Sequence, residues 1–172
     1  TPEYVYSFGK QNWFEYSAAE HRAARDSVAL FDQSSFSKYL VKGRDACAAL
    51  QRICSADVDV AAGRMVYTHW LNERGCIEAD LTVTRIAENE FLVVSGAAVT
   101  HKDLDWLKRH IDASMNCVVV DVTNAWAVFG LMGPSSRALL QSLTGVSFET
   151  RDFAFGDSKP IEVGYAPCRA SR

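Results

Sequence analysis

The chain has 172 residues, of which 48% are hydrophobic and 23% are charged, and its formal net charge is −3. This composition is typical of a globular protein that is long enough to bury a core, in one large domain or two small ones. The sequence holds no concentrated basic segment and no apolar run near the roughly 20 residues that a membrane helix needs, so it predicts neither a nucleic acid nor a membrane as partner.

The first predicted helix lies within residues 16–32, YSAAEHRAARDSVALFD. Ser17 is the expected N-cap, and Glu20 stands three residues later, where it completes a capping box. Apolar residues then recur at helical spacing, which predicts that one side of this helix packs on another part of the protein. The residues of that stripe are Ala24, Val28 and Phe31.

Residues 36–123 are predicted to run strand, helix, three strands, helix and strand. Alternating apolar residues between turn residues indicate the strands, which are 36–43, 64–71, 76–86, 90–96 and 117–123. Apolar stripes indicate helices at 44–54 and 100–111. Their buried residues are expected to be Ala46, Leu50, Ile53, Leu104, Leu107 and Ile111. In the second helix, Thr100 is the expected cap and Asp103 closes its capping box.

Beyond residue 123, the chain is predicted to form a strand at 125–133, a helix at 134–145 and a loop at 149–160. Residues 160–172, PIEVGYAPCRASR, are interpreted as one unfinished strand, because no Gly, Pro or cap closes it. The chain also begins at Thr1 without Met. We therefore expect the sequence to be a piece of a larger polypeptide.

The mixture of hairpins and helices predicts an α+β class, with antiparallel sheets flanked by helices. The strands that open and close the middle region are expected to bracket an inner subdomain at 37–123. Residues 1–36 and 124–172 are then expected to pack together as an outer, incomplete subdomain.

The cysteines and histidines show no ligand pattern. The five cysteines are odd in number, the sequence contains no C-x-x-C, and the spacings match no zinc motif. We therefore expect reduced thiols in a reducing compartment, and no bound metal. Residues 1–20 also lack the apolar core of a signal peptide.

The hairpin predicted at residues 67–85, YTHWLNERGCIEADLTVTR, holds the candidate site. Symmetrical pairing around a turn at 72–75 places Tyr67 opposite Asp80, with Gly75 in the left-handed conformation, although a bulge there would shift the register. Because side chains alternate across a strand, one face is polar and the other largely apolar. The polar face is expected to carry Tyr67, His69, Glu78, Asp80, Thr82 and Thr84.

Two hypotheses explain Asp80, which is a poor strand former in the middle of a strand. In the first, this face of the sheet is simply solvated. In the second, it is the floor of a site, where the carboxylate holds a cationic or N–H-rich ligand or acts as a general base. Tyr67 would then stack on the same ligand or hydrogen-bond to it.

Three segments resemble the glycine cleavage T-protein, or aminomethyltransferase, superfamily. LNERGCIEADLTV resembles its LN-x-x-G-G-x-x-D-D-L-x-V segment, and FLVVSGAAVTHKDLDWL resembles the strand and helix that follow. GLMGPSSRALLQSLTG resembles a later G-P-x-S-x-x-x-L element, so the resemblance runs from about Glu20 to the end. The N-terminal FGKQNWFEYSAAEHR is similar to one subgroup, the folate-binding C-terminal region of dimethylglycine and sarcosine dehydrogenases.

The resemblance implies a T-protein-like fold, truncated before the family's C-terminal barrel subdomain and its G-E-x-G-x-E segment. It implies that a one-carbon, methylene unit passes from a small N-methyl amine or iminium to tetrahydrofolate. FAD would be bound by an N-terminal flavin domain of the same natural polypeptide, in the bacterial cytoplasm or the mitochondrial matrix. The alternatives are a stand-alone aminomethyltransferase and a non-catalytic regulatory homologue that acts by protein interaction.

The resemblance also implies roles for four residues of this sequence. Asp80, the aspartate directly before Leu in D-L-x-V, is the implied catalytic residue and binds the folate near its reactive nitrogens. Tyr67, Thr82 and Ser95 are implied to bind the folate as well. Ser95 stands where T-proteins have asparagine, and Ala79 replaces the first aspartate of the pair, as in the dehydrogenase subgroup.

Overall fold

The computed structural model of the protein describes residues 3–172 and confirms the predicted α+β class. Thr1 and Pro2, which begin the predicted outer subdomain, lie outside the described residues. The helices are α1 (Phe14–Asp26), α2 (Ala46–Ile53), α3 (Thr100–His110) and α4 (Ser136–Ser142), with a 3-10 turn η1 (Ala97–Val99). The strands are β1 (Ala29–Asp32), β2 (Ser37–Lys42), β3 (Arg64–Leu71), β4 (Ile77–Ala87), β5 (Glu90–Ser95), β6 (Val118–Asp121), β7 (Phe129–Met132), β8 (Ser158–Val163) and β9 (Ala166–Ser171).

A five-stranded antiparallel sheet, in the order β3-β4-β5-β2-β6, forms the centre of the structure. Helices α2 and α3 contribute Leu50 and Leu107 to the core that covers one face of this sheet. Every second strand residue joins this core because successive side chains point to opposite faces. Trp70, Tyr39 and Phe91 are its largest fully buried aromatic side chains.

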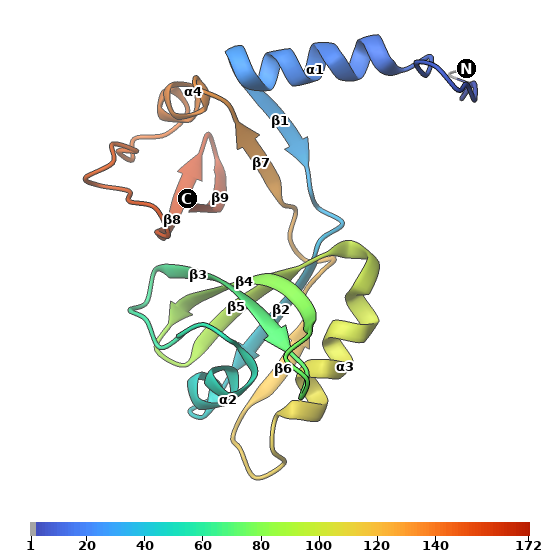
Figure 1. Cartoon of the computed structure of the whole chain (residues 1–172). Helices are drawn as coiled ribbons and strands as arrows, with labels where there is room; N and C mark the ends of the chain where they lie inside the picture. Colours follow the sequence, from blue (N-terminus) through green and yellow to red (C-terminus); the bar gives the residue numbers. More distant parts are fainter. Residues whose placement is uncertain (1–2) are drawn as a thin grey trace.

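The remaining elements lie together at one end of the five-stranded sheet (Figure 1). Strands β1 and β7 pair with each other and connect the two parts, while α1, α4 and the β8–β9 hairpin lie beyond them. The boundaries proposed for the subdomains, at residues 36 and 124, stay a prediction.

The environment and the start of α1 differ from the prediction. The helix begins at Phe14, three residues before Ser17, and Trp13 at the N-cap position makes no side-chain cap. No residue of α1 is buried, and Val28 and Phe31 follow the end of the helix, so the capping box and the packed stripe are both wrong. Residues with high helix propensity form this helix locally, but the stripe would have required it to continue past Asp26.

The last segment of the chain was also predicted wrongly. Residues 160–172 are not one unfinished strand: β8 and β9 form an antiparallel hairpin around Gly164. Gly164 has a φ of +60°, the left-handed conformation in which glycine suits a tight turn. Gly164 and Tyr165 separate two short segments of strand-forming residues, which is the sequence signal for this turn.

The predicted capping box of α3 is not formed either. Val99 occupies the N-cap position without a side-chain cap, and Thr100 lies inside the helix, where its hydroxyl contacts that of Ser37. Asp103 turns into the protein and is 1% exposed, and neither of its carboxylate oxygens has a hydrogen-bond partner among the described residues. Burial therefore raises the pKa of this carboxyl above its ordinary value of 3.8.

Asp103 is expected to make the folded state less stable as the pH rises. Its raised pKa means that the folded protein binds more protons than the unfolded chain at pH values above about 3.8, so stability falls as the pH increases towards the raised pKa. Replacing Asp103 with Asn should therefore stabilise the protein, relative to wild type, by a larger amount at pH 8 than at pH 4. Urea unfolding of both proteins at the two pH values measures this effect. If the variant and the wild type differ in free energy of unfolding by the same amount at pH 4 and pH 8, the prediction is contradicted.

Candidate functional site

Asn72 organises the turn that joins β3 to β4. Its Oδ1 accepts hydrogen bonds from the backbone N–H groups of Arg74 at 3.0 Å and Cys76 at 3.1 Å. Gly75 donates its N–H to the Asn72 carbonyl at 2.8 Å and has a φ of +76°, which confirms the left-handed glycine expected from the sequence. The turn thus depends on two residues, an asparagine that binds backbone N–H groups and a glycine that permits the bend.

The register of the hairpin differs by two residues from the symmetrical pairing that the sequence suggested. Tyr67 pairs with Thr82, His69 pairs with Asp80, and the register shifts between Trp70 and Leu71. The turn causes the difference, because Cys76 belongs to it: the Asn72 N–H donates to the Cys76 carbonyl at 3.0 Å. A shift of two residues changes the pairs but returns every side chain to its predicted face.

The polar face of the hairpin, here called the site face, carries Tyr67, His69, Glu78, Asp80 and Thr82. Tyr67 Oη donates a hydrogen bond to Asp80 Oδ2 at 2.8 Å and lies 3.3 Å from His69 Nε2. The Tyr67 and His69 rings meet edge to face, with centroids 5.1 Å apart. The bond to the Asp80 carboxylate raises the pKa of the Tyr67 phenol. Tyr67 is 59% exposed and Asp80 is exposed as well, so a ligand can reach both.

The structure brings together three of the four residues implied to bind folate. Thr82 is half-buried on the site face, next to its partner Tyr67. Ser95 is not with them, because it pairs with Leu81, is 3% exposed and lies on the core face of the sheet. Val94 pairs with Thr82 and occupies the corresponding position on the site face.

Strand alternation in the sequence places His69 on this face, but no motif gives it a role. Its position two residues after Tyr67 on the same strand was the available signal, because residues i and i+2 share a face. The register adds what the sequence lacked, since His69 is the direct partner of Asp80.

Glu78 is the second carboxylate of the site face, and it is occupied by structural contacts. Asn72 Nδ2 donates to Glu78 Oε1 at 2.8 Å, and Lys102 Nζ lies 3.1 Å from Glu78 Oε2. The hydrogen bond from Asn72, followed by that from Lys102, lowers the pKa of Glu78. Asp80 differs, because no hydrogen bond from the described residues reaches its Oδ1. Asp80 is therefore the carboxylate of this face that is free to bind a ligand.

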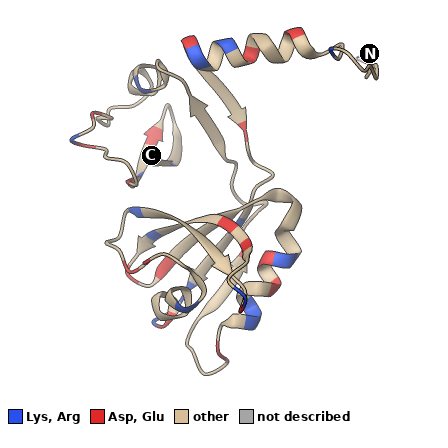
Figure 2. Ribbon diagram, viewed as in Figure 1, with Lys and Arg blue, Asp and Glu red and all other residues tan. Residues whose placement is uncertain are grey.

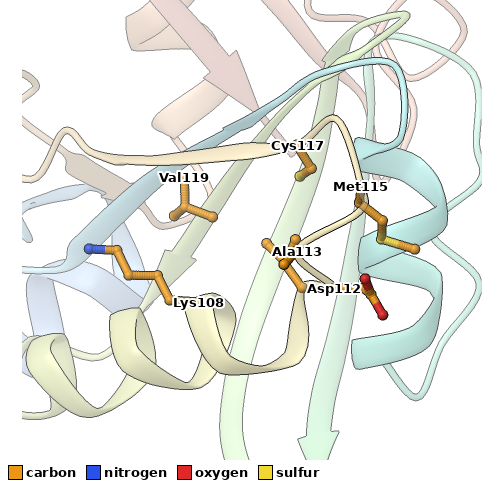
Figure 3. Close-up of a pocket in the computed structure, with 7 residues that line it drawn as sticks. Lys108, Asp112, Ala113, Met115, Cys117 and Val119 are labelled. Atoms are coloured by element: carbon orange, nitrogen blue, oxygen red, sulfur yellow. The ribbon is translucent and has the colours of Figure 1, made fainter.

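A hollow of about 210 Å³ lies away from the hairpin, between the C-terminal end of α3 and strand β6, at the sheet edge opposite β3. It contains none of the four residues implied to bind folate (Figure 3). Its lining residues are Lys108, Ile111, Asp112, Ala113, Met115, Cys117 and Val119. Its only charged lining residues are Lys108 and Asp112, which form no wider cluster of polar side chains, so we assign the hollow no role.

The charges of the described residues are dispersed over the structure. Figure 2 shows basic and acidic residues interspersed along α1 and α3 and among the strands of the sheet. Residues 3–172 hold no group of three or more His, Cys, Asp or Glu side chains placed to bind a metal ion. The helices described in this range are also too short or too polar to cross a membrane.

Comparison with known proteins places the whole chain in one group of relatives. The family model of the GCVT N-terminal domain matches residues 2–172. The chain is 42% identical, over 168 residues, to 4-methylaminobutanoate oxidase (formaldehyde-forming) of Paenarthrobacter nicotinovorans, covering 96% of this chain and 20% of that protein. It is 30% identical, over 171 residues, to mitochondrial dimethylglycine dehydrogenase of Homo sapiens, covering 99% of this chain and 20% of that protein. The chain thus spans about a fifth of the length of each relative.

A solved structure has the same fold. The crystal structure of glycine cleavage system aminomethyltransferase T from Bartonella henselae matches with a TM-score of 0.73 and 24% sequence identity. The match covers 91% of this chain and 43% of that one. Together with the antiparallel sheets, this likeness confirms the T-protein-like fold that the sequence implied.

Proposed function

This chain belongs to the family of the GCVT N-terminal domain, and from that membership we propose that the site face of its β3–β4 hairpin binds tetrahydrofolate for one-carbon transfer. The observation that carries the proposal is the arrangement of Asp80, whose Oδ2 is held by Tyr67 while Oδ1 remains free on an exposed face. A reduced folate presents ring N–H groups, and an ionised carboxylate accepts hydrogen bonds from such groups.

Each residue of the proposed site has a distinct role. Asp80 accepts an N–H of the reduced ring, and takes the proton that leaves when that nitrogen forms its bond to the incoming carbon. Tyr67 holds the carboxylate and offers its aromatic ring as a surface against which the ligand can pack. Thr82, beside Tyr67, contributes a hydroxyl that both donates and accepts. Ser95 is left out of this proposal, because it faces the core.

We also propose that the chain works as part of a longer polypeptide that contains an FAD-binding domain, which oxidises a small N-methyl amine to the iminium donor. The two relatives compared above are each about five times as long as this chain, and one is a dehydrogenase. The β1–β7 ribbon supports this proposal, since Leu30 is 66% exposed and Phe129 is 59% exposed. A two-stranded ribbon with exposed apolar side chains is marginally stable in water, so further protein surface would stabilise it by covering it.

The compartment we propose is reducing, either a bacterial cytoplasm or a mitochondrial matrix. All five cysteines are free thiols in the structure. Burial raises the pKa of Cys54 to about 11, which keeps this thiol protonated and unreactive. The mitochondrial dehydrogenase among the relatives fits the second of these compartments.

Titration with 5-formyltetrahydrofolate tests the proposed function. Trp70 lies buried under the site face, so tryptophan fluorescence should report binding. We expect a saturable change with a Kd between about 1 μM and 1 mM, the usual range of enzyme KM values. The matched control ligand is p-aminobenzoylglutamate, which lacks the pterin ring and should bind at least about tenfold more weakly. Saturation by neither compound would contradict the proposal.

A second candidate function is oxidation without folate, in which the one-carbon unit leaves as formaldehyde. The observation that favours it is the name of the 42% identical relative, which says that this relative forms formaldehyde. The two functions differ in one measurable respect. If formaldehyde is the product, the addition of tetrahydrofolate to the natural polypeptide should leave the yield of free formaldehyde unchanged, whereas capture by folate should lower it.

A further inference from the structure

The hydroxyl of Tyr67 is shared between Asp80 and His69, and the direction of its two hydrogen bonds can be assigned. Its Oη lies 2.8 Å from Asp80 Oδ2 and 3.3 Å from His69 Nε2. A phenol has one proton to donate, and an ionised carboxylate can only accept. The phenolic proton therefore points at Asp80, and a lone pair of Oη faces His69 Nε2.

We infer that His69 is a positioning residue of the site, which acts through Tyr67 to keep the phenolic proton directed at Asp80. The contact between His69 and Tyr67 is a hydrogen bond only if Nε2 carries a proton, so the geometry selects that tautomer. The donors then form an ordered chain, from His69 Nε2 to Tyr67 Oη and from Tyr67 Oη to Asp80 Oδ2. Without His69, the Tyr67 hydroxyl would be free to turn towards solvent.

The backbone around His69 holds the imidazole in place for this role. The His69 N–H donates to Ser55 Oγ at 3.3 Å, and the His69 carbonyl accepts from the Ser55 N–H at 2.9 Å. On its other side, His69 pairs with Asp80 in the hairpin. The strand is thus fixed on both sides of His69, although β3 is an edge strand of the sheet. The rings of His69 and Tyr67 also meet edge to face, with an angle of 77° between their planes.

A fixed donor direction determines which ligands suit the site. Because Tyr67 donates to Oδ2, the acceptor of Asp80 that remains for a ligand is Oδ1. A ligand that presents only hydrogen-bond acceptors to Asp80 would leave Oδ1 without a partner. The ligand must therefore donate a hydrogen bond at this point, from an N–H or an O–H group. The identification of this donor as the reduced pterin ring rests on the proposed function. The direction of the hydrogen bonds within the protein is independent of that proposal.

The first test needs no ligand. In a ¹⁵N NMR spectrum of the full chain, recorded at about pH 8 where imidazoles are mostly neutral, His69 should carry its proton on Nε2. Tyr67→Phe removes the acceptor and should shift the His69 ring towards a mixture of the two tautomers. The exposed His21 on α1 is the internal reference and should not respond. A His69 protonated on Nδ1 in the wild-type chain would overturn the inference, whatever the chain binds.

The second test is a double-mutant cycle on the binding of 5-formyltetrahydrofolate. His69→Leu should weaken binding by about three- to tenfold, the equivalent of one hydrogen bond, and His69→Gln should restore most of the loss because its amide can donate. In a Tyr67→Phe background, His69→Leu should have no further effect. Equal effects of His69→Leu in both backgrounds would show that His69 does not act through Tyr67. Failure of the wild-type chain to bind would reject the folate proposal instead, and the NMR test would still decide the hydrogen-bond direction.

Discussion

Asp80→Asn is expected to weaken the binding of 5-formyltetrahydrofolate by about 10- to 100-fold and to leave the fold intact. The amide is nearly isosteric with the carboxylate, and the position is exposed, so the sheet should not be disturbed. What is lost is a hydrogen bond to a charged group, which contributes about 1.5–3 kcal/mol. The change also replaces one of two acceptor oxygens by a donor, which conflicts with either Tyr67 or the ligand N–H. Fluorescence titration and a thermal melt of the variant measure the two effects separately.

Glu78→Gln is the matched control for this prediction. It removes the same charge from the same strand, two residues away, but Glu78 is engaged by Asn72 and Lys102 rather than free to bind a ligand. Binding by Glu78→Gln should stay within about threefold of wild type, since a long-range charge effect at an exposed site is small in salt solution. If Asp80→Asn binds with wild-type affinity, or if both variants lose affinity equally, Asp80 does not have the role proposed for it.

The elements between residues 36 and 123 could be predicted from the sequence because their signals are local. Strand β3 was predicted with the bounds that the structure has, and alternation placed Trp70 in the core and Tyr67 outside it. The buried stripe of α2 was predicted because apolar residues recur at helical spacing within eight residues. In these cases the turn residues and the periodicity lie in the same short segment as the element they specify.

The surroundings of α1 and α3 could not be predicted in this way. A Ser or Thr followed by Glu or Asp three residues later has the spacing of a capping box, but whether it caps depends on where the chain enters the helix. In α3 the entry is the 3-10 turn η1, which moves Thr100 into the helix and turns Asp103 towards the core. That turn depends on contacts with Ser37 at the start of β2, which is distant in sequence.

The site was predictable to the extent that it depends on side-chain alternation. Tyr67 and Asp80 lie on the face predicted for them although the predicted register is wrong by two residues. A shift by an even number of residues changes the partner of each residue but not the face on which its side chain lies. His69 could not be recognised, since its pairing with Asp80 follows from the longer turn that includes Cys76. The folate-binding role of Ser95 was implied by the resemblance alone. The face of the sheet on which Ser95 lies depends on how β5 pairs with β4, and that register shifts between Arg85 and Ala87.

Trp70→Ala is the substitution expected to destabilise the protein most, by about 3–5 kcal/mol. Trp70 is fully buried, lies opposite Ala79 in the hairpin and packs in the core shared with α2 and α3. The cost is a large part of the 5–15 kcal/mol that typically separates folded from unfolded protein, so much of the variant could be unfolded at 37 °C. Trp126→Ala is the matched control, because Trp126 is 43% exposed and its loss should cost no more than about 1 kcal/mol. Urea unfolding of both variants, followed by circular dichroism, compares them directly, and equal midpoints would contradict this account of the core.

The position of Trp70 also connects stability to the proposed site. Trp70 is the residue that follows His69 on β3, so the same strand presents one side chain to the core and the next to the site face. A cavity at Trp70 should therefore loosen the strand that positions His69 and Tyr67, and lower the affinity for 5-formyltetrahydrofolate at temperatures where the variant is still folded. Titration calorimetry measures this affinity, because the variant lacks the Trp70 fluorescence that reports binding in the wild-type chain. Trp70→Phe keeps an aromatic ring and removes an Nε1–H that has no partner among the described residues, so it should recover most of the stability and of the affinity. If Trp70→Ala stays folded and binds as wild type does, the hairpin keeps its site geometry without support from the core, and the geometry must come from the turn at Asn72 and the anchor at Ser55 alone.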